Sequence, residues 1–97
     1  MDILEQMNRT QGKIKIQIET FLTAMKLTAQ DNTYDQRCAA KFEERFKNLQ
    51  YSYGWLLSFE NYVHGCSRYF ECANCKKIAK EICKIIKRFI SNYEMLL

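Results

Sequence analysis

Four side chains that bind soft metal ions lie within twelve residues of one another. His64, Cys66, Cys72 and Cys75 could supply one nitrogen and three sulfur ligands, a set that suits tetrahedral zinc, and Cys72 and Cys75 have the Cys-x2-Cys spacing of a zinc half-site. The stretch lacks the two well-separated ligand pairs that make zinc signatures specific. Reduced structural thiols are therefore the preferred interpretation, with zinc and a local disulfide as the alternatives.

The other two cysteines are expected to stand apart from this cluster. On a continuous helix Cys72 and Cys83 are eleven residues apart, about 16 Å at 1.5 Å per residue, which is too far to share an ion. Cys38 is expected at the far end of the preceding helical hairpin. The odd count of five cysteines, without a recognisable signal peptide or membrane span, indicates mostly reduced thiols in a cytoplasmic or host intracellular protein.

Catalytic chemistry finds little support in these residue types. The chain has one His, no recognisable motif around a Ser or Cys nucleophile, and three glycines that form no phosphate-binding loop. A thiol of lowered pKa at Cys66 or Cys72, near Arg68 and a helix N-terminus, would react with oxidants without making an enzyme. We therefore expect a non-enzymatic protein without a cofactor, with zinc as the alternative.

Helices are predicted to position these residues, because the chain has no proline and few glycines. Asp2 and Glu5 have capping-box spacing, and apolar residues then recur every three or four positions up to residue 25. After a turn at 30–33, a second stripe runs from residue 38 and changes face just after Gly54, which predicts a kink or a break there. Gly65 is expected to end this segment in a left-handed conformation.

These patterns predict one all-α domain over residues 1–97. Three segments of about thirty residues favour an antiparallel three-helix bundle whose middle helix is kinked or broken near Gly54. Breaks at both Gly12 and Gly54 would instead give a compact four- or five-helix bundle. Ile16 and Leu27 lie off the first apolar stripe, either as scattered surface residues or as a ridge for a partner or a second copy, so a homodimer is one expected form.

The last predicted helix combines an apolar stripe, in which Cys75 is central, with a basic face. Residues 66–97 carry seven basic and three acidic side chains, so the whole net charge of +4 lies in this third of the chain. Within 76–88, Glu81 is the single acidic residue, and the basic residues point away from the stripe. They are Lys76, Lys77, Lys80, Lys84, Lys87 and Arg88. Such a face is either a solvated surface or a site for an acidic partner.

An aromatic run precedes the cysteine-rich stretch. Trp55 and Tyr62 are rotated away from Leu56 and Val63, so they either pack on another helix or stand exposed as contact residues. The sequence thus predicts a small helical accessory or regulatory protein that binds a macromolecular partner, with an acidic protein surface favoured. The alternatives are non-specific nucleic-acid binding through the same lysines, and a zinc-stapled or redox-responsive module around residues 64–75.

Overall fold

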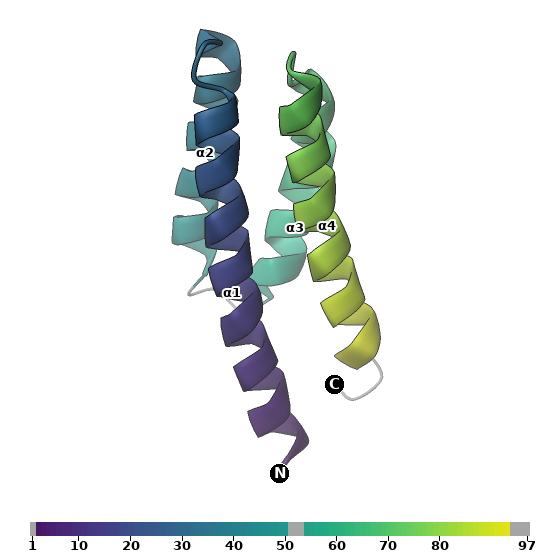
Figure 1. Ribbon diagram of the computed structural model, residues 1–97. Coiled ribbons are helices and arrows are strands. Elements are labelled where there is room, and N and C mark those ends of the chain that lie inside the picture. Colours follow the sequence, from purple (N-terminus) through teal and green to yellow (C-terminus); the bar gives the residue numbers. More distant parts are fainter. Residues whose placement is uncertain (1, 51–53, 94–97) are drawn as a thin grey trace.

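The computed structural model describes residues 2–50 and 54–93, which form four α-helices and one 3-10 helix. The α-helices are α1 (Ile3–Thr28), α2 (Thr33–Leu49), α3 (Trp55–Cys66) and α4 (Ala73–Tyr93), and the 3-10 helix η1 spans Ser67–Tyr69. Successive α-helices run in opposite directions (Figure 1), and each of the pairs α1–α2, α2–α3, α3–α4 and α4–α1 is in contact. The chain is therefore an up-down-up-down bundle of 46 × 18 × 18 Å. The all-α prediction is confirmed, the three-helix form is wrong, and the four-helix alternative fits.

The first two helices begin where side chains cap their free amides. The Asp2 side chain accepts a hydrogen bond from the Leu4 N–H at 3.2 Å at the start of α1. At the start of α2, the Asn32 side chain accepts from the Asp35 N–H at 2.9 Å. Each cap satisfies a donor that the helix itself leaves unpaired.

The predicted middle helix is divided at Gly54. This glycine has φ +72°, a left-handed conformation that costs a residue with a Cβ about 1–2 kcal/mol, and it precedes the first residue of α3. The break allows α3 to fold back along α2. Gly12 lies inside the continuous helix α1, so the break that the sequence allowed there does not occur.

The prediction for Gly65 is wrong, because this residue lies inside α3, which continues to Cys66. The chain then tightens into η1, and the Ser67 hydroxyl donates to the His64 carbonyl at 3.1 Å. A helix carbonyl that would otherwise need a glycine cap is thereby satisfied. Phe70 follows with extended backbone and inserts its ring into the core.

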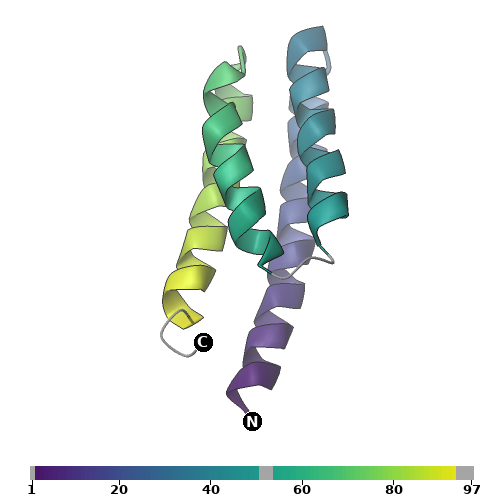
Figure 2. The same cartoon turned by 180° about the vertical axis from the view of Figure 1, so that it is seen from behind.

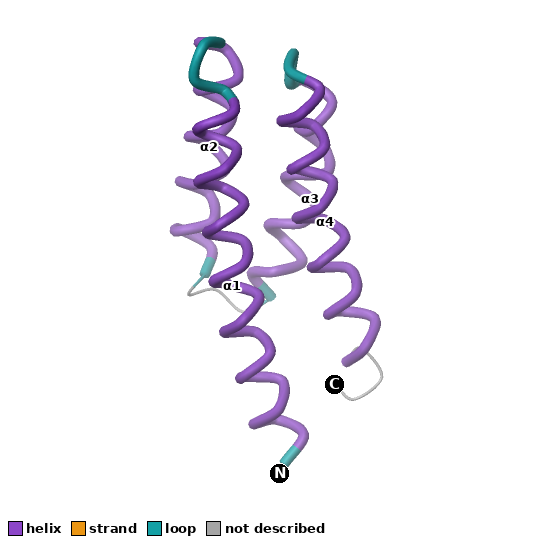
Figure 3. The backbone as a smooth tube through the Cα atoms, viewed as in Figure 1, coloured by secondary structure: helices purple, strands orange, loops and turns teal. Residues whose placement is uncertain are grey.

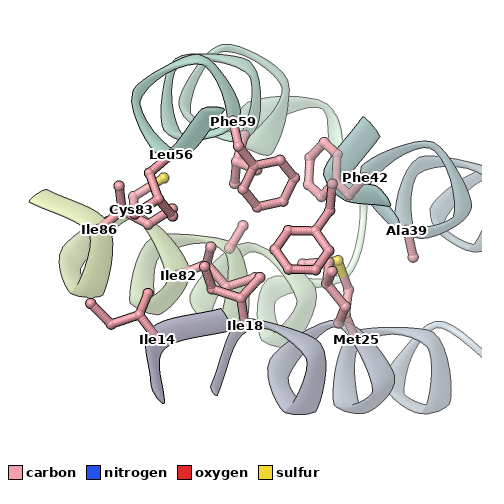
Figure 4. Close-up of a cluster of buried hydrophobic side chains, with 14 of the residues drawn as sticks. Ile14, Ile18, Met25, Ala39, Phe42, Leu56, Phe59, Ile82, Cys83 and Ile86 are labelled. Atoms are coloured by element: carbon pink, nitrogen blue, oxygen red, sulfur yellow. The ribbon is translucent and has the colours of Figure 1, made fainter. Parts of the chain in front are cut away.

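The core lies along the bundle axis, where side chains from all four α-helices meet (Figure 4). Its largest members are aromatic rings in edge-to-face contact: Phe46 with Phe59 at 5.2 Å between centroids, and Phe42 with Phe70 at 5.5 Å. Such pairs add about 0.5–1.5 kcal/mol each beyond the apolar area they bury. The aromatic contacts thus join α2 both to α3 and to the segment before α4.

The two ends of the bundle differ. The α1–α2 turn and the segment joining α3 to α4 lie at one end, and the start of α1 and the end of α4 lie toward the other (Figure 3). At that second end, the first turns of α1 extend past the end of α2 (Figure 2). The first buried residue of α1 is Ile14. Ile16 and Leu27, predicted to lie off the core stripe, are 65% and 67% exposed. None of the helices over residues 2–50 and 54–93 has an apolar stretch long enough to cross a membrane.

Candidate functional site

The fold distributes the four predicted zinc ligands over three places. His64 lies beside Glu60 and Cys83, whereas Cys72 and Cys75 lie beside Asp35. Cys66 lines a separate pocket of about 140 Å³, together with Cys38 and three tyrosines. In the described part of the chain, the four predicted ligands therefore do not come together around one point.

The thiols of Cys72 and Cys75 lie at the N-terminus of α4. The Cys72 carbonyl accepts the first hydrogen bond of the helix, from the Lys76 N–H at 3.2 Å, so Cys72 is the capping residue. The backbone amides of Cys75 and Asn74 donate to the Cys72 sulfur and lower the pKa of this thiol. Burial, reinforced by the charge of Cys72, raises the pKa of Cys75 to about 12. The two neighbouring thiols thus differ strongly in their readiness to ionise.

Asp35, which is fully buried, fixes this end of α4 from the first turn of α2. Its carboxylate accepts hydrogen bonds from the backbone N–H groups of Glu71 and Cys72, both at 2.8 Å. Asn32 adds a second link, since its side-chain amide donates to the Glu71 carboxylate at 3.0 Å. The buried Asp35 carboxylate therefore connects the start of α2 to the segment that holds the Cys72 thiol.

This first cluster can undergo dithiol chemistry. The sulfur atoms of Cys72 and Cys75 and a carboxylate oxygen of Asp35 all lie within 4.8 Å of one another. The outer thiol, half-buried and of lowered pKa, suits attack on a disulfide, and the buried Cys75 is placed to complete the exchange. The sequence predicted a local disulfide as one alternative, but not the capping role of Cys72.

A second cluster joins α3 to α4. Glu60 and His64 are four residues apart and share one face of α3, and Cys83 faces them from α4, where Figure 4 shows it between the two helices. One ligand atom from each of the three residues lies within 4.8 Å of the other two. The Cys83 thiol also donates to the Glu60 carbonyl oxygen at 3.9 Å. Burial, and then the charge of Glu60, raise the pKa of Cys83 to about 11.

Glu60 is only 4% exposed, yet its carboxylate is poorly paired. Its Oε1 atom is buried and accepts no hydrogen bond. The nearest cation is the Lys87 ammonium, whose Nζ lies 3.6 Å from Oε1, too far for a hydrogen bond. A carboxylate buried with so weak a partner reduces stability.

The second cluster opens on a pocket of about 210 Å³. His64, Ser67 and Cys83 line this pocket, and Lys80, Lys84 and Lys87 complete its lining. The predicted lysine face and the second cluster are therefore adjacent. Their proximity gives the mouth of the pocket a positive charge.

The predicted basic face is largely accessible. Its side chains are exposed except for that of Lys76, which is half-buried. Lys84 pairs with Glu81 at 3.3 Å and Lys87 with Glu60. Within residues 2–50 and 54–93, no carboxylate forms an ion pair with Lys77, Lys80 or Arg88.

The two aromatic residues predicted as partner contacts, Trp55 and Tyr62, are less exposed than most of the lysines. Trp55 is 6% exposed and packs edge-to-face on Phe46 at 5.4 Å, so it is a core residue and offers no exposed anchor. Tyr62 is half-buried between the Phe42 ring at 5.6 Å and the Arg45 guanidinium at 5.1 Å. The folding back of α3 buries Trp55 and half-buries Tyr62, so of the two alternatives that the sequence left open the structure shows packing on another helix, not an exposed pair of contact residues.

Sequence reasoning missed Asp35, Glu60 and Cys83 as site residues. The pairing of Asp35 with amides thirty-six and thirty-seven residues away leaves no local signal. For Glu60 the signal was present, since this residue continues the apolar stripe of the preceding segment and has a His four positions later. Cys83 lies next to Ile82, a central member of the predicted stripe of α4, but the buried face is wider than that stripe.

No family model matches the chain, and no curated protein or solved structure matches it.

Proposed function

We propose that the chain is a non-enzymatic accessory protein of a reducing, cytoplasmic or host intracellular compartment, and that it binds an acidic protein surface through α4. The observation that carries this proposal is the set of exposed cations on one helix, where Lys77, Lys80 and Arg88 have no ion-pair partner among the described residues. Surface cations without an ion-pair partner attract an acidic surface at long range.

The composition of this face favours a protein over a nucleic acid. Proteins that bind single-stranded nucleic acid place aromatic rings between the basic residues. Residues 76–88 include no aromatic residue, and Phe89, which follows directly, is buried. Base readout in duplex DNA uses mainly Arg, Asn and Gln, whereas five of the six basic residues here are lysines. Nucleic-acid binding through this face would be non-specific and strongly salt-dependent.

Charge reversal tests the proposal. The double variant Lys77→Glu/Lys80→Glu changes two lysines that have no ion pair, so it leaves the described ion pairs of the bundle intact. Arg9→Glu/Lys13→Glu, at exposed positions of α1, is the matched control because it makes the same change in net charge. Immobilised wild-type and variant chains are exposed to nuclease-treated extract of the native host, and retained proteins are quantified by mass spectrometry.

We expect an acidic protein that is retained by the wild type and the control, is released by raised salt, and is lost with the double lysine variant. Equal retention by all three chains would exclude this face as the contact. A gel shift with duplex and single-stranded DNA and RNA at low salt tests the alternative. A salt-sensitive shift that the lysine variant abolishes, without a protein partner, would favour nucleic acid.

The Cys72–Cys75 pair supports a second candidate function, a response to the thiol redox state. In this step the Cys72 thiolate attacks oxidised glutathione and releases one glutathione; Cys75 then loses its proton and displaces the second, leaving a Cys72–Cys75 disulfide. Mass spectrometry after equilibration in glutathione buffers of stated ratio, with Cys38→Ser as the control, measures this disulfide. Its absence under oxidising ratios would exclude the redox response.

A further inference from the structure

We propose that Glu60, His64 and Cys83 form a zinc-binding site that links α3 to α4. This site shares His64 with the four-residue set that the sequence suggested, but its other two ligands, Glu60 and Cys83, are new. It does not depend on the proposed partner-binding function. Its evidence is the convergence of three different ligand types at the α3–α4 interface, two of them buried, together with a buried Glu60 oxygen that accepts no hydrogen bond.

The donor set suits zinc. Zinc in proteins is bound by His nitrogen, Cys sulfur and carboxylate oxygen, and three protein ligands with one open position form a recurrent arrangement. Bonds of about 2.0–2.3 Å at tetrahedral angles place ligand atoms roughly 3.3–3.8 Å apart. The three atoms here lie within 4.8 Å of one another, so inward movements of about 1 Å would bring them into position. His64 is exposed and Glu60 has a long side chain, and both can make that movement.

The unpaired Glu60 oxygen is the second, independent observation. This carboxylate is almost completely buried, and the Lys87 ammonium that stands closest is itself 61% exposed. A mostly solvated cation at 3.6 Å compensates a buried anion only in part. A divalent cation between Glu60, His64 and Cys83 would supply the missing charge at bonding distance. The zinc–sulfur bond forms as the Cys83 thiol releases its proton to solvent, and Lys87 turns outward.

The other cluster of potential ligands, Asp35, Cys72 and Cys75, has no carboxylate oxygen without a hydrogen bond. Both oxygens of Asp35 accept backbone hydrogen bonds at 2.8 Å, and the Cys72 sulfur accepts two amide hydrogens. A metal there would have to displace contacts that hold the N-terminus of α4. Glu60, by contrast, offers an oxygen that accepts no hydrogen bond and has only the Lys87 ammonium, at 3.6 Å, beside it.

The pocket beside His64 and Cys83 leaves room for a fourth zinc ligand. A space of about 210 Å³ lies over His64 and Cys83, large enough for a water molecule or a small anion on the metal. Lys80 and Lys84 line this space and would favour an anion there. Their ammonium groups are exposed, so solvent and salt weaken their repulsion of the metal itself.

Metal titration of the full chain tests the site. Untagged protein is stripped with a chelator, dialysed under reducing conditions and titrated with Zn²⁺ against a chromophoric competitor, and bound metal is counted by elemental analysis. Titration with Co²⁺ gives a spectroscopic readout, since a thiolate ligand produces a charge-transfer band and tetrahedral coordination produces intense visible bands. The variants are His64→Gln, Cys83→Ser and, as the matched control in the other cluster, Cys72→Ser.

We expect one zinc per chain, and an affinity that falls by more than about 100-fold with His64→Gln and with Cys83→Ser but not with Cys72→Ser. The thiolate–cobalt band should disappear with Cys83→Ser alone among the three variants. His64 is exposed, so its variant keeps the test valid if replacement of buried Cys83 disturbs the fold, which circular dichroism reports. Absence of zinc binding by the wild type overturns the proposal. So does binding that Cys72→Ser abolishes and His64→Gln leaves intact.

Discussion

Replacing Asp35 should destabilise the bundle more than replacing any exposed acidic residue. The Asp35 side chain has no exposed surface, and it holds the backbone amides of Glu71 and Cys72 just before α4. Asp35→Ala removes both hydrogen bonds and leaves two partly buried amides without their partner. Asp35→Asn keeps the shape but turns an amide donor toward one of these donors.

The magnitude follows from the two contacts. A hydrogen bond to a charged group contributes about 1.5–3 kcal/mol, so two of them give about 3–6 kcal/mol. We expect Asp35→Ala to lower the free energy of unfolding by about 4 kcal/mol and Asp35→Asn by about 2 kcal/mol. A chain of this size has roughly 5–15 kcal/mol in total, so the alanine variant should approach the limit of folding.

Urea unfolding followed by circular dichroism measures both variants. With a slope of about 2 kcal/mol per molar urea, the midpoint of Asp35→Ala should fall by roughly 2 M. Asp31→Asn, at an exposed acid in the neighbouring turn, is the control and should stay within about 0.5 kcal/mol of the wild type. A cost below about 1 kcal/mol for Asp35→Ala would refute the reasoning, because the two amides would then have other partners.

Three further results are expected. Glu60→Met should raise the stability of the metal-free chain by about 1–2 kcal/mol, because it removes a buried and poorly paired charge; thermal unfolding measures this, and a clear loss would contradict it. Glu43→Gln should cost about 0.5–1 kcal/mol at pH 7, because the hydrogen bond from Lys26 at 2.7 Å lowers the pKa of Glu43. That contribution is complete above the unfolded pKa of about 4.3 and is lost as the pH falls through the lower folded value, so the difference in urea unfolding should shrink as the pH is lowered below about 4.3. Iodoacetamide at neutral pH should modify Cys72 well before Cys75, as peptide mass spectrometry would show, and equal rates would contradict the assigned cap.

Features that depend only on residues close together in the sequence could be predicted from it. The absence of proline, the spacing of apolar residues and the phase change at Gly54 indicate helices and one interruption. Whether the chain bends or reverses at such an interruption depends on what the next segment packs against, and here Trp55 and Phe59 pack on Phe46 of α2. The choice between three and four helices is therefore made by tertiary contacts.

The same reversal explains the errors at the site. A continuous helix over residues 34–64 would place Cys38 far from Cys66, but the reversal brings both into one pocket. It also turns Trp55 inward. The change of face after Gly54 takes Glu60 out of the apolar stripe, yet the fold buries Glu60 beside Cys83 at the α3–α4 interface. A single polar residue buried at a helix interface does not follow the spacing of the apolar residues, so that spacing alone cannot reveal it.

Lys87 belongs both to the proposed partner-binding face and to the surroundings of the proposed zinc site. In the metal-free bundle its ammonium lies 3.6 Å from the Glu60 carboxylate and is partly withdrawn from the lysine face. Zinc at Glu60, His64 and Cys83 would release Lys87 and, after loss of the Cys83 proton, add one net positive charge beneath that face. An acidic partner should therefore bind the zinc-loaded chain more tightly, and linkage then requires the partner to increase the affinity for zinc by the same factor. Equal partner affinity with and without zinc would mean that the two surfaces of α4 act independently.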